Sequence, residues 1–165
     1  MRLPLGEVVV EAAPLDVQTF RTLVQQLCER SFNGYLAWTG YGYDGLEEGV
    51  FLFSSGKIVA VSYAHLKYGY SLDGPDALKL ALNAVRTDPC AYTLVQFRPA
   101  KVILVLAFNE SARVNVRCGS VLNQIPGVYD PSWVKGIIKN LSQQEIDRIR
   151  VLAKFGLTGV KVGEI

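Results

Sequence analysis

The sequence predicts an α+β fold in which helices pack on a mainly antiparallel sheet, in the order β-α-β-β-β-α-β-α, followed by a C-terminal helical extension. Two apolar, β-prone runs, 50–53 and 58–61, are joined by the turn Ser54-Ser55-Gly56, which is typical of an antiparallel hairpin. Apolar residues recur at helical spacing over 17–28 and 76–85. Strands that follow one another through short turns favour an antiparallel sheet.

Length and composition predict one domain with an appendage. The chain has 165 residues, of which 50% are hydrophobic, enough for a real core. We expect residues 1–115 to form an α+β core module, and 116–165 a connector and a C-terminal helix that docks on the core or on a partner. No apolar run approaches the roughly 18 residues of a membrane span. The N-terminus lacks the apolar stretch of a signal peptide, so a cytoplasmic protein without membrane contact is predicted.

The first third of the chain reads as a strand, a helix and a second strand. The β-branched segment 7–12 ends before Pro14 and predicts an edge strand. Asp16 stands where a helix N-cap belongs, ahead of the periodic segment 17–28. Gly34 is predicted to be a structural glycine that stops this helix, and 35–39 form the next strand.

Two segments rich in Gly and Tyr are predicted to be loops on either side of the hairpin. Residues 40–49 form a ten-residue insert, longer than the two to five residues of an ordinary hairpin connection. After the turn at Gly56 the next strand runs towards Tyr63, and 65–73 form the second loop. Gly74, followed by Pro75, is predicted to open a helix that continues to Val85.

The rest of the chain begins with one alternating segment and one ambiguous segment. Residues 91–97 alternate as a strand, whereas 100–113 fit a helix or a strand equally well. A connector follows, and Ser142 with Glu145 matches a capping box, so a helix is predicted to begin at Ser142. Whether that helix packs on its own chain or on a second one stays open.

The sequence offers no catalytic, cofactor or metal site. His65 is the single histidine, and the serines at 54 and 55 lack the Gly-x-Ser-x-Gly surroundings of a hydrolase nucleophile. The glycines at 40, 42 and 45 imitate a dinucleotide loop, but a strand follows them instead of a helix. Acidic residues 44, 47 and 48 indicate a solvated loop. Cys28, Cys90 and Cys118 are odd in number and widely spaced, which predicts buried free thiols and no disulfide.

Aromatic side chains in the two loops are the candidate binding residues. Because tyrosine combines a large contact area with a polar tip, it is common at interfaces. Burial over the sheet edge and stacking on nucleic-acid bases are the alternatives. The candidate interaction residues are Trp38, Tyr41, Tyr43, Tyr68 and Tyr70.

Charge is distributed unevenly along the chain. Residues 1–97 hold seven Lys/Arg and ten Asp/Glu, a net charge of −3, and residues 98–165 hold ten and five, a net charge of +5. Opposite charges favour a homodimer or contact between the two parts, and a nucleic-acid partner is not expected. The alternative function is a small-ligand or nucleic-acid binding protein that uses the aromatic loops with a basic set: Arg98, Lys101, Arg113 and Arg117.

The hairpin and the helix after it resemble a known signalling module. The pattern is a helix, then Asn33-Gly34-Tyr35-Leu36, then the segment 49–60 with Gly56 in its turn, then the helix over 76–82. In these features, across residues 15–112, the chain resembles the PATAN-type module of some bacterial response regulators, and it is similar to an uncharacterised archaeal family with the same core. The resemblance implies a non-catalytic interaction or adaptor module for an unidentified protein partner, and it transfers no active-site residue.

Overall fold

The computed structural model describes residues 1–154, with only the backbone described for residues 141–142 and 145–154. The chain divides into two compact units, Met1–Pro131 and Ser132–Ile165. The first unit holds the sheet and helices α1 to α4. The helix α5 (Pro131–Lys154) begins where the first unit ends.

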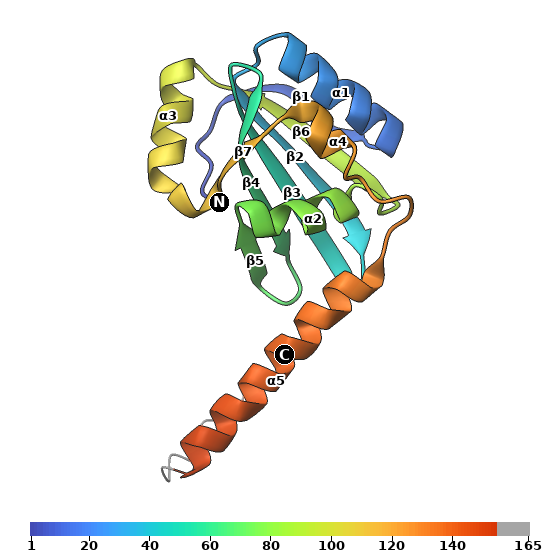
Figure 1. Ribbon diagram of the computed structural model, residues 1–165, viewed down its shortest axis with the longest axis vertical. Coiled ribbons are helices and arrows are strands. Elements are labelled where there is room, and N and C mark those ends of the chain that lie inside the picture. Colours follow the sequence, from blue (N-terminus) through green and yellow to red (C-terminus); the bar gives the residue numbers. More distant parts are fainter. Residues whose placement is uncertain (155–165) are drawn as a thin grey trace. The chain divides into compact units, whose positions relative to one another are not determined.

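The predicted α+β fold is confirmed, and its centre is an antiparallel sheet of seven strands (Figure 1). The order β1-β6-β2-β3-β4-β5 places β1 at one edge, and the short strand β7 pairs with β4 beside β5. Strands β2, β3 and β4 are consecutive neighbours and form the longest ladders. The strands are β1 (Glu7–Pro14), β2 (Gly34–Gly42), β3 (Gly45–Ser54), β4 (Lys57–His65), β5 (Tyr70–Asp73), β6 (Cys90–Gln96) and β7 (Arg113–Val116).

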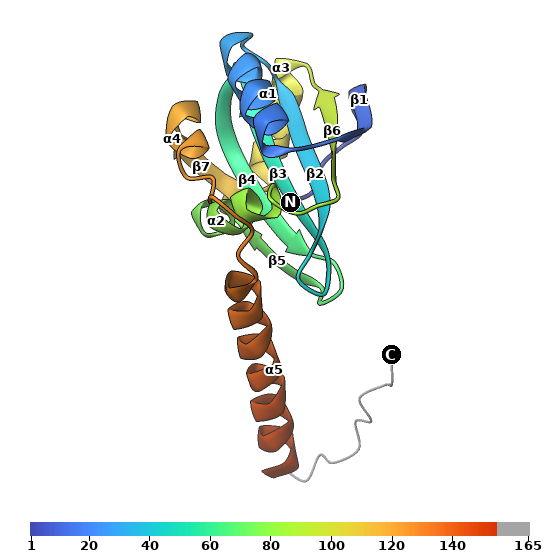
Figure 2. The ribbon, with the colours of Figure 1, turned by 90° about the vertical axis from the view of Figure 1, so that its right-hand side faces the viewer.

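Helices cover both faces of the sheet, but unequally (Figures 1 and 2). On one face α1 supplies Phe20, whose ring packs edge-on against Trp38 at 5.0 Å and lies 5.9 Å from Phe51. The opposite face carries a second cluster in which Val102 and Val105 of α3 pack with Leu52. The helices are α1 (Val17–Glu29), α2 (Pro75–Ala84), α3 (Pro99–Phe108), α4 (Cys118–Leu122) and α5, with a 3₁₀ turn at Glu110–Ala112.

Local signals in the sequence set several of these boundaries. The Asp16 carboxylate accepts a hydrogen bond from the Thr19 amide at 2.6 Å and caps α1. Proline occupies the first turn of both α2 and α3, where its missing N–H costs nothing. Gly34 opens β2 with φ +148°, and Gly74 precedes α2 with φ +77°. Segment 100–113, open between helix and strand, is helical up to Phe108 and enters β7 at Arg113.

The first predicted aromatic loop is wrong, and the second is shorter than predicted, a turn over residues 66–69. Strands β2 and β3 continue through the expected insert and pair as far as Gly42 and Gly45, leaving a two-residue turn. Strand β5 occupies the end of the second segment, where Tyr70 pairs with His65. Glycine-rich segments are typical of loops, but here backbone hydrogen bonds to the neighbouring strands satisfy the N–H and C=O groups of these residues and extend the hairpin.

The turn between β3 and β4 packs against the end of α1. Ser55 and Gly56 both have positive φ, +48° and +75°, the conformation of a tight hairpin turn. A Cβ on Gly56 would lie 2.2 Å from the carbonyl oxygen of Cys28. The Gly56 amide donates to the Phe32 carbonyl at 2.8 Å, so the turn is tied to the segment that follows α1.

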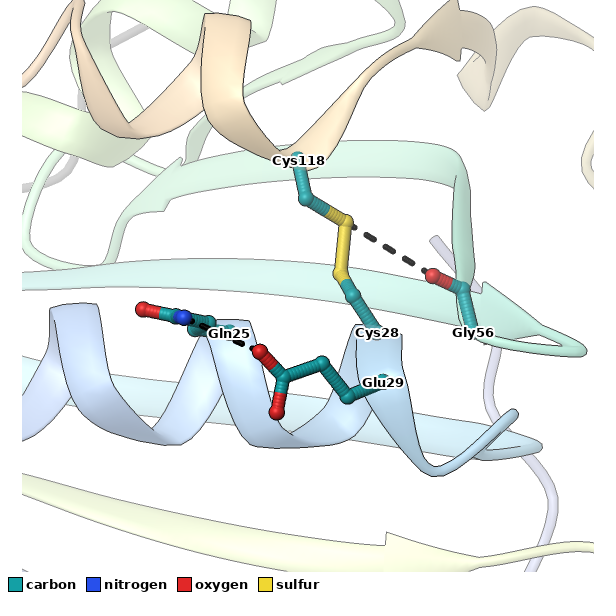
Figure 3. Close-up of a disulfide and its surroundings, with 5 residues drawn as sticks. All are labelled: Gln25, Cys28, Glu29, Gly56 and Cys118. Atoms are coloured by element: carbon teal, nitrogen blue, oxygen red, sulfur yellow. Dashed lines mark hydrogen bonds between the residues drawn. A yellow bond between two sulfur atoms is a disulfide. The ribbon is translucent and has the colours of Figure 1, made fainter.

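A disulfide joins Cys28 of α1 to Cys118 of α4, and the expected free thiols at these positions are wrong (Figure 3). The two residues are 90 apart in sequence, with Cα atoms 6.8 Å apart. The Cys118 sulfur also lies 3.6 Å from the Gly56 carbonyl oxygen (Figure 3). The spacing of the cysteines in the sequence could not predict this pair, because α4 reaches α1 only after the chain has returned to the sheet through β7. Cys90 is free and buried, as predicted.

The start predicted for the C-terminal helix is wrong. The backbone is helical from Pro131 to Lys154, so Ser142 and Glu145 lie inside α5 and cannot cap its N-terminus. Pro131, a residue suited to the first helical turn, begins the helix instead. The side chains of Ser142 and Glu145 lie outside the described residues.

Candidate interaction surface

Trp38, expected to lie at the surface, is a core residue. Its side chain is only 1% exposed, and its indole Nε1 donates a hydrogen bond to the carbonyl of Ala81 in α2 at 3.2 Å. The indole ring also packs edge-on against Phe51 at 4.9 Å. Trp38 therefore joins the sheet to α2, and its prediction as a contact residue is corrected.

Tyr41 is exposed and belongs to an apolar row at the end of the sheet. It is 59% exposed and pairs with Leu46 across the β2–β3 ladder. The Leu66 amide, just after β4, donates to the Leu46 carbonyl at 2.9 Å, which places Leu66 next in line. Leu46 and Leu66 are 43% and 48% exposed. We call Tyr41, Leu46 and Leu66 the tip row, three large side chains side by side at the ends of β2, β3 and β4.

Contacts between the two turns brace the tip row. The Asp44 carboxylate forms an ion pair with Lys67 at 2.7 Å and accepts a hydrogen bond from the Tyr68 hydroxyl. The hydrogen bond from Lys67 lowers the pKa of the Asp44 carboxyl, with Tyr68 adding to the effect. Because the two turns come from different hairpins, these contacts hold the hairpin ends together.

An apolar groove adjoins the tip row. Its volume is about 480 Å³, and Tyr41 and Leu46 form part of its wall with Pro14 of β1 and Pro89 before β6. Such concave apolar surfaces suit a side chain of a bound partner. The lining residues are Ala12, Pro14, Thr39, Gly40, Tyr41, Leu46, Pro89, Cys90 and Ala91.

The other three predicted tyrosines differ in how far they are exposed to solvent. Tyr68 is 38% exposed and its ring packs against His65 at 4.9 Å, on the strand face opposite to the tip row. Tyr43 and Tyr70 are half-buried. Of the five predicted contact residues, Tyr41 and Tyr68 are thus the exposed ones.

A buried carboxylate beneath the tip row was missed by the sequence reasoning. Glu47 has no exposed surface, and its oxygens accept hydrogen bonds from the hydroxyls of Tyr63, at 3.0 Å, and Tyr129, and from the Tyr43 amide at 3.1 Å. Burial first, and then Glu47, raise the pKa of the Tyr63 and Tyr129 phenols. The alternation of side chains along β3 could have indicated that Glu47 is buried, because Glu47 shares a strand face with the buried Gly49 and Phe51.

We call Glu47 and its three hydrogen-bond partners, Tyr43, Tyr63 and Tyr129, the Glu47 cluster. This cluster also holds the segment that leads to α5. The Tyr129 hydroxyl accepts a hydrogen bond from the Tyr43 amide at 2.7 Å while donating to Glu47. Nearby, Asn83 of α2 donates to the Asp130 carbonyl at 3.0 Å and accepts from its amide at 2.9 Å. Three donors satisfy the oxygens of the Glu47 side chain, as a buried polar group requires.

His65 and the acidic residues do not assemble a reactive centre in the described residues. His65 is 1% exposed, and its Nε2 lies 2.8 Å from the Tyr43 carbonyl. Ser54 and Ser55 lie at the opposite end of the β3–β4 ladder. Among the side chains that the structure describes, no group of three from His, Cys, Asp or Glu is placed to hold a metal ion. No helix in that part of the chain is long and apolar enough to cross a membrane.

The four basic residues of the alternative function lie apart from the tip row. Arg98 and Lys101 line a groove at the start of α3. Arg113 begins β7 and donates a hydrogen bond to the Leu106 carbonyl at 3.3 Å, and Arg117 precedes α4. They therefore do not complete one site with the tyrosines.

Comparison with known proteins gives one match. The model of a family described as an uncharacterised protein conserved in archaea (DUF2226) matches residues 1–109. The matched region includes strands β1 to β6 and helices α1 to α3. No curated protein and no solved structure matches the chain.

Proposed function

The chain belongs to the family of uncharacterised proteins conserved in archaea, DUF2226, and we propose that this member is a non-catalytic, regulatory protein-interaction module. The observation that carries the proposal is the tip row. Three apolar side chains, each between 43% and 59% exposed, stand together beside an apolar groove. Large apolar side chains gathered beside a groove mark interaction sites more often than scattered ones do.

Preorganisation supports a binding role for this surface. The Asp44–Lys67 ion pair and the Tyr68 hydrogen bond join the two turns, so the tip row is fixed before a partner arrives. A surface that is already ordered loses less conformational entropy on binding. The absence of charge on the tip row favours a protein partner over a nucleic acid, whose phosphates require Lys and Arg.

The proposal extends to the type of module and to its place in the cell. The β3–β4 hairpin with its Gly56 turn and the proline-started helix α2 support a PATAN-type core that acts as a signalling adaptor. We place it in the cytoplasm as a homodimer. The Cys28–Cys118 disulfide is compatible with that location because intracellular proteins of hyperthermophilic archaea commonly carry disulfides.

Quantitative capture from native lysate tests the proposal. The bait is the full chain, and the test variant is Tyr41→Ser/Leu46→Ser/Leu66→Ser. The matched control is Val8→Ser/Val9→Ser/Val128→Ser, which removes three other exposed apolar side chains. Wild type and control should enrich the same protein at low and high salt, and the tip variant should lose it with an unchanged melting temperature.

Two results would contradict this function. Equal capture by the tip variant and the wild type would show that the tip row does not contact the partner. Binding of single- or double-stranded oligonucleotides that weakens steeply as salt rises would favour the nucleic-acid alternative, through phosphate contacts.

A further inference from the structure

Helix α3 presents an apolar face to solvent. Ile103, Leu104 and Phe108 are 69%, 56% and 75% exposed, while Val102 and Val105 on the other side of the helix are buried. A helix that is apolar on all sides is normally enclosed by protein. The outer face of α3 consists of Ala100, Ile103, Leu104, Ala107 and Phe108.

This face is complementary to itself when two copies run antiparallel. Ile103 and Phe108 lie equally far, in opposite directions along the chain, from the point between Val105 and Leu106, and so do Leu104 and Ala107. In an antiparallel pair, Ile103 of each copy therefore packs against Phe108 of the other copy, and Leu104 packs against the small Ala107. Such pairing of one patch with itself is the geometry of a two-fold dimer.

The charges at the ends of α3 follow the same symmetry. Lys101 lies in its first turn and Glu110 follows its C-terminus, and the two are equally far from the same point between Val105 and Leu106. The Lys101 ammonium bonds the Leu5 carbonyl and lies 5.1 Å from the centre of the Phe97 ring, which fixes its position. Glu110 is exposed and makes no ion pair within the described residues. Antiparallel pairing sets Lys101 against Glu110 twice, whereas parallel pairing sets like charges together.

An open groove lies beside the proposed contact, at the start of α3. Its volume is about 510 Å³, and Ala100 and Lys101 line it together with Leu5 and Phe97. In the antiparallel arrangement Phe108 of a second copy lies opposite Ile103, one helical turn from Ala100 at the edge of this groove.

We propose that α3 is the self-association face of this protein and packs antiparallel against α3 of a second copy, with each Phe108 against Ile103 of the other copy. This inference names the surface of the homodimer included in the proposed function and rests on it. A lipid surface fits α3 less well, because helices that lie on membranes carry a Lys- and Arg-rich polar face and α3 holds one lysine. With a helix of only 10 residues the contact lies at the small end of interface sizes, so dissociation should be measurable by dilution.

Sedimentation equilibrium of the full chain over a concentration series tests the inference. The variant Ile103→Asp/Phe108→Asp should weaken dimerisation at least about 30-fold, the effect of losing a central anchor. The exposed Val128→Asp, a residue 76% exposed outside α3, is the control and should leave the dissociation constant unchanged. Since the changed residues are exposed, melting of the diluted monomer should not fall.

A charge exchange tests the antiparallel direction. Lys101→Glu alone and Glu110→Lys alone should each weaken the dimer up to about fivefold, and the double variant should restore it. A chain that is monomeric at every concentration, or a dimer unaffected by Ile103→Asp/Phe108→Asp, would overturn the inference. Neither result bears on the tip row. The capture experiment with the tip variant therefore tests the proposed interaction module independently of the dimer.

Discussion

Gly49 stands directly opposite Trp38 in the β2–β3 ladder, and the indole ring lies over it. A Cβ on Gly49 would be 2.3 Å from the Trp38 ring, so no larger residue fits without moving the indole. The missing side chain makes room for the ring to reach Phe20 and Phe51. This pair explains why Trp38 belongs to the core although it lies in an aromatic-rich segment.

Gly49→Ala should destabilise the fold by about 2 kcal/mol, because overpacking a core forces side chains off their preferred positions. Urea unfolding measures the change. Gly127→Ala is the control, since a Cβ there meets nothing within 4 Å, and it should stay within about 0.5 kcal/mol of the wild type. An equal effect of both substitutions would show that the indole does not occupy this space.

The β3–β4 turn gives a second stability prediction. Gly56→Ala should cost more than Gly69→Ala, although both glycines have positive φ, +75° and +58°. Gly69→Ala adds only the left-handed strain of about 1 kcal/mol. Gly56→Ala adds a collision with the Cys28 carbonyl, 2.2 Å away. Thermal melting of the two variants should separate these contributions, and equal losses would contradict the packing of the turn on α1.

Stability should fall at alkaline pH because of the Glu47 cluster. Burial raises the pKa of Tyr63 and Tyr129 in the folded protein. Below about pH 10 these tyrosines are neutral in both states, so their contribution is complete; above it the unfolded chain loses protons first. The free energy of unfolding should then fall by up to about 1.4 kcal/mol per pH unit for each tyrosine.

Tyr129→Phe isolates that contribution. It should lower stability at neutral pH by about 1–2 kcal/mol through the lost hydrogen bonds, and reduce the alkaline slope. Tyr41→Phe, at a 59% exposed position, is the control. Urea titrations from neutral to alkaline pH measure both quantities, and an unchanged slope in Tyr129→Phe would contradict the buried contact.

The disulfide predicts one reactive thiol in the unfolded, non-reduced protein, that of Cys90. Counting alkylated cysteines by mass spectrometry tests this, and three labels would show that Cys28 and Cys118 are unpaired. Cys28→Ser/Cys118→Ser should destabilise the fold by about 3 kcal/mol, because the bond closes a loop of 90 residues in the unfolded chain. Added reductant should lower the melting temperature of the wild type and not of this variant.

Much of the architecture followed from local chemistry. The helix over Val17–Glu29, the hairpin through Gly56 and the proline-started helix at Pro75 depend on caps, turns and periodicity within a few residues. Tyr41 and Tyr68 were also found as exposed candidates, since tyrosine has a visible preference for interfaces.

Contacts between distant residues decided the rest. The composition of 40–49 indicates a loop, but ladder bonds to β4 hold its β3 part in the sheet and bury Glu47 beneath Tyr129. Likewise, only the return of the chain through β7 brings Cys118 to Cys28. The sequence by itself determined the kinds of element and most of their order, because these depend on neighbours in the chain. Tertiary structure decided which aromatic, acidic and thiol groups are buried, because burial depends on residues far apart in sequence.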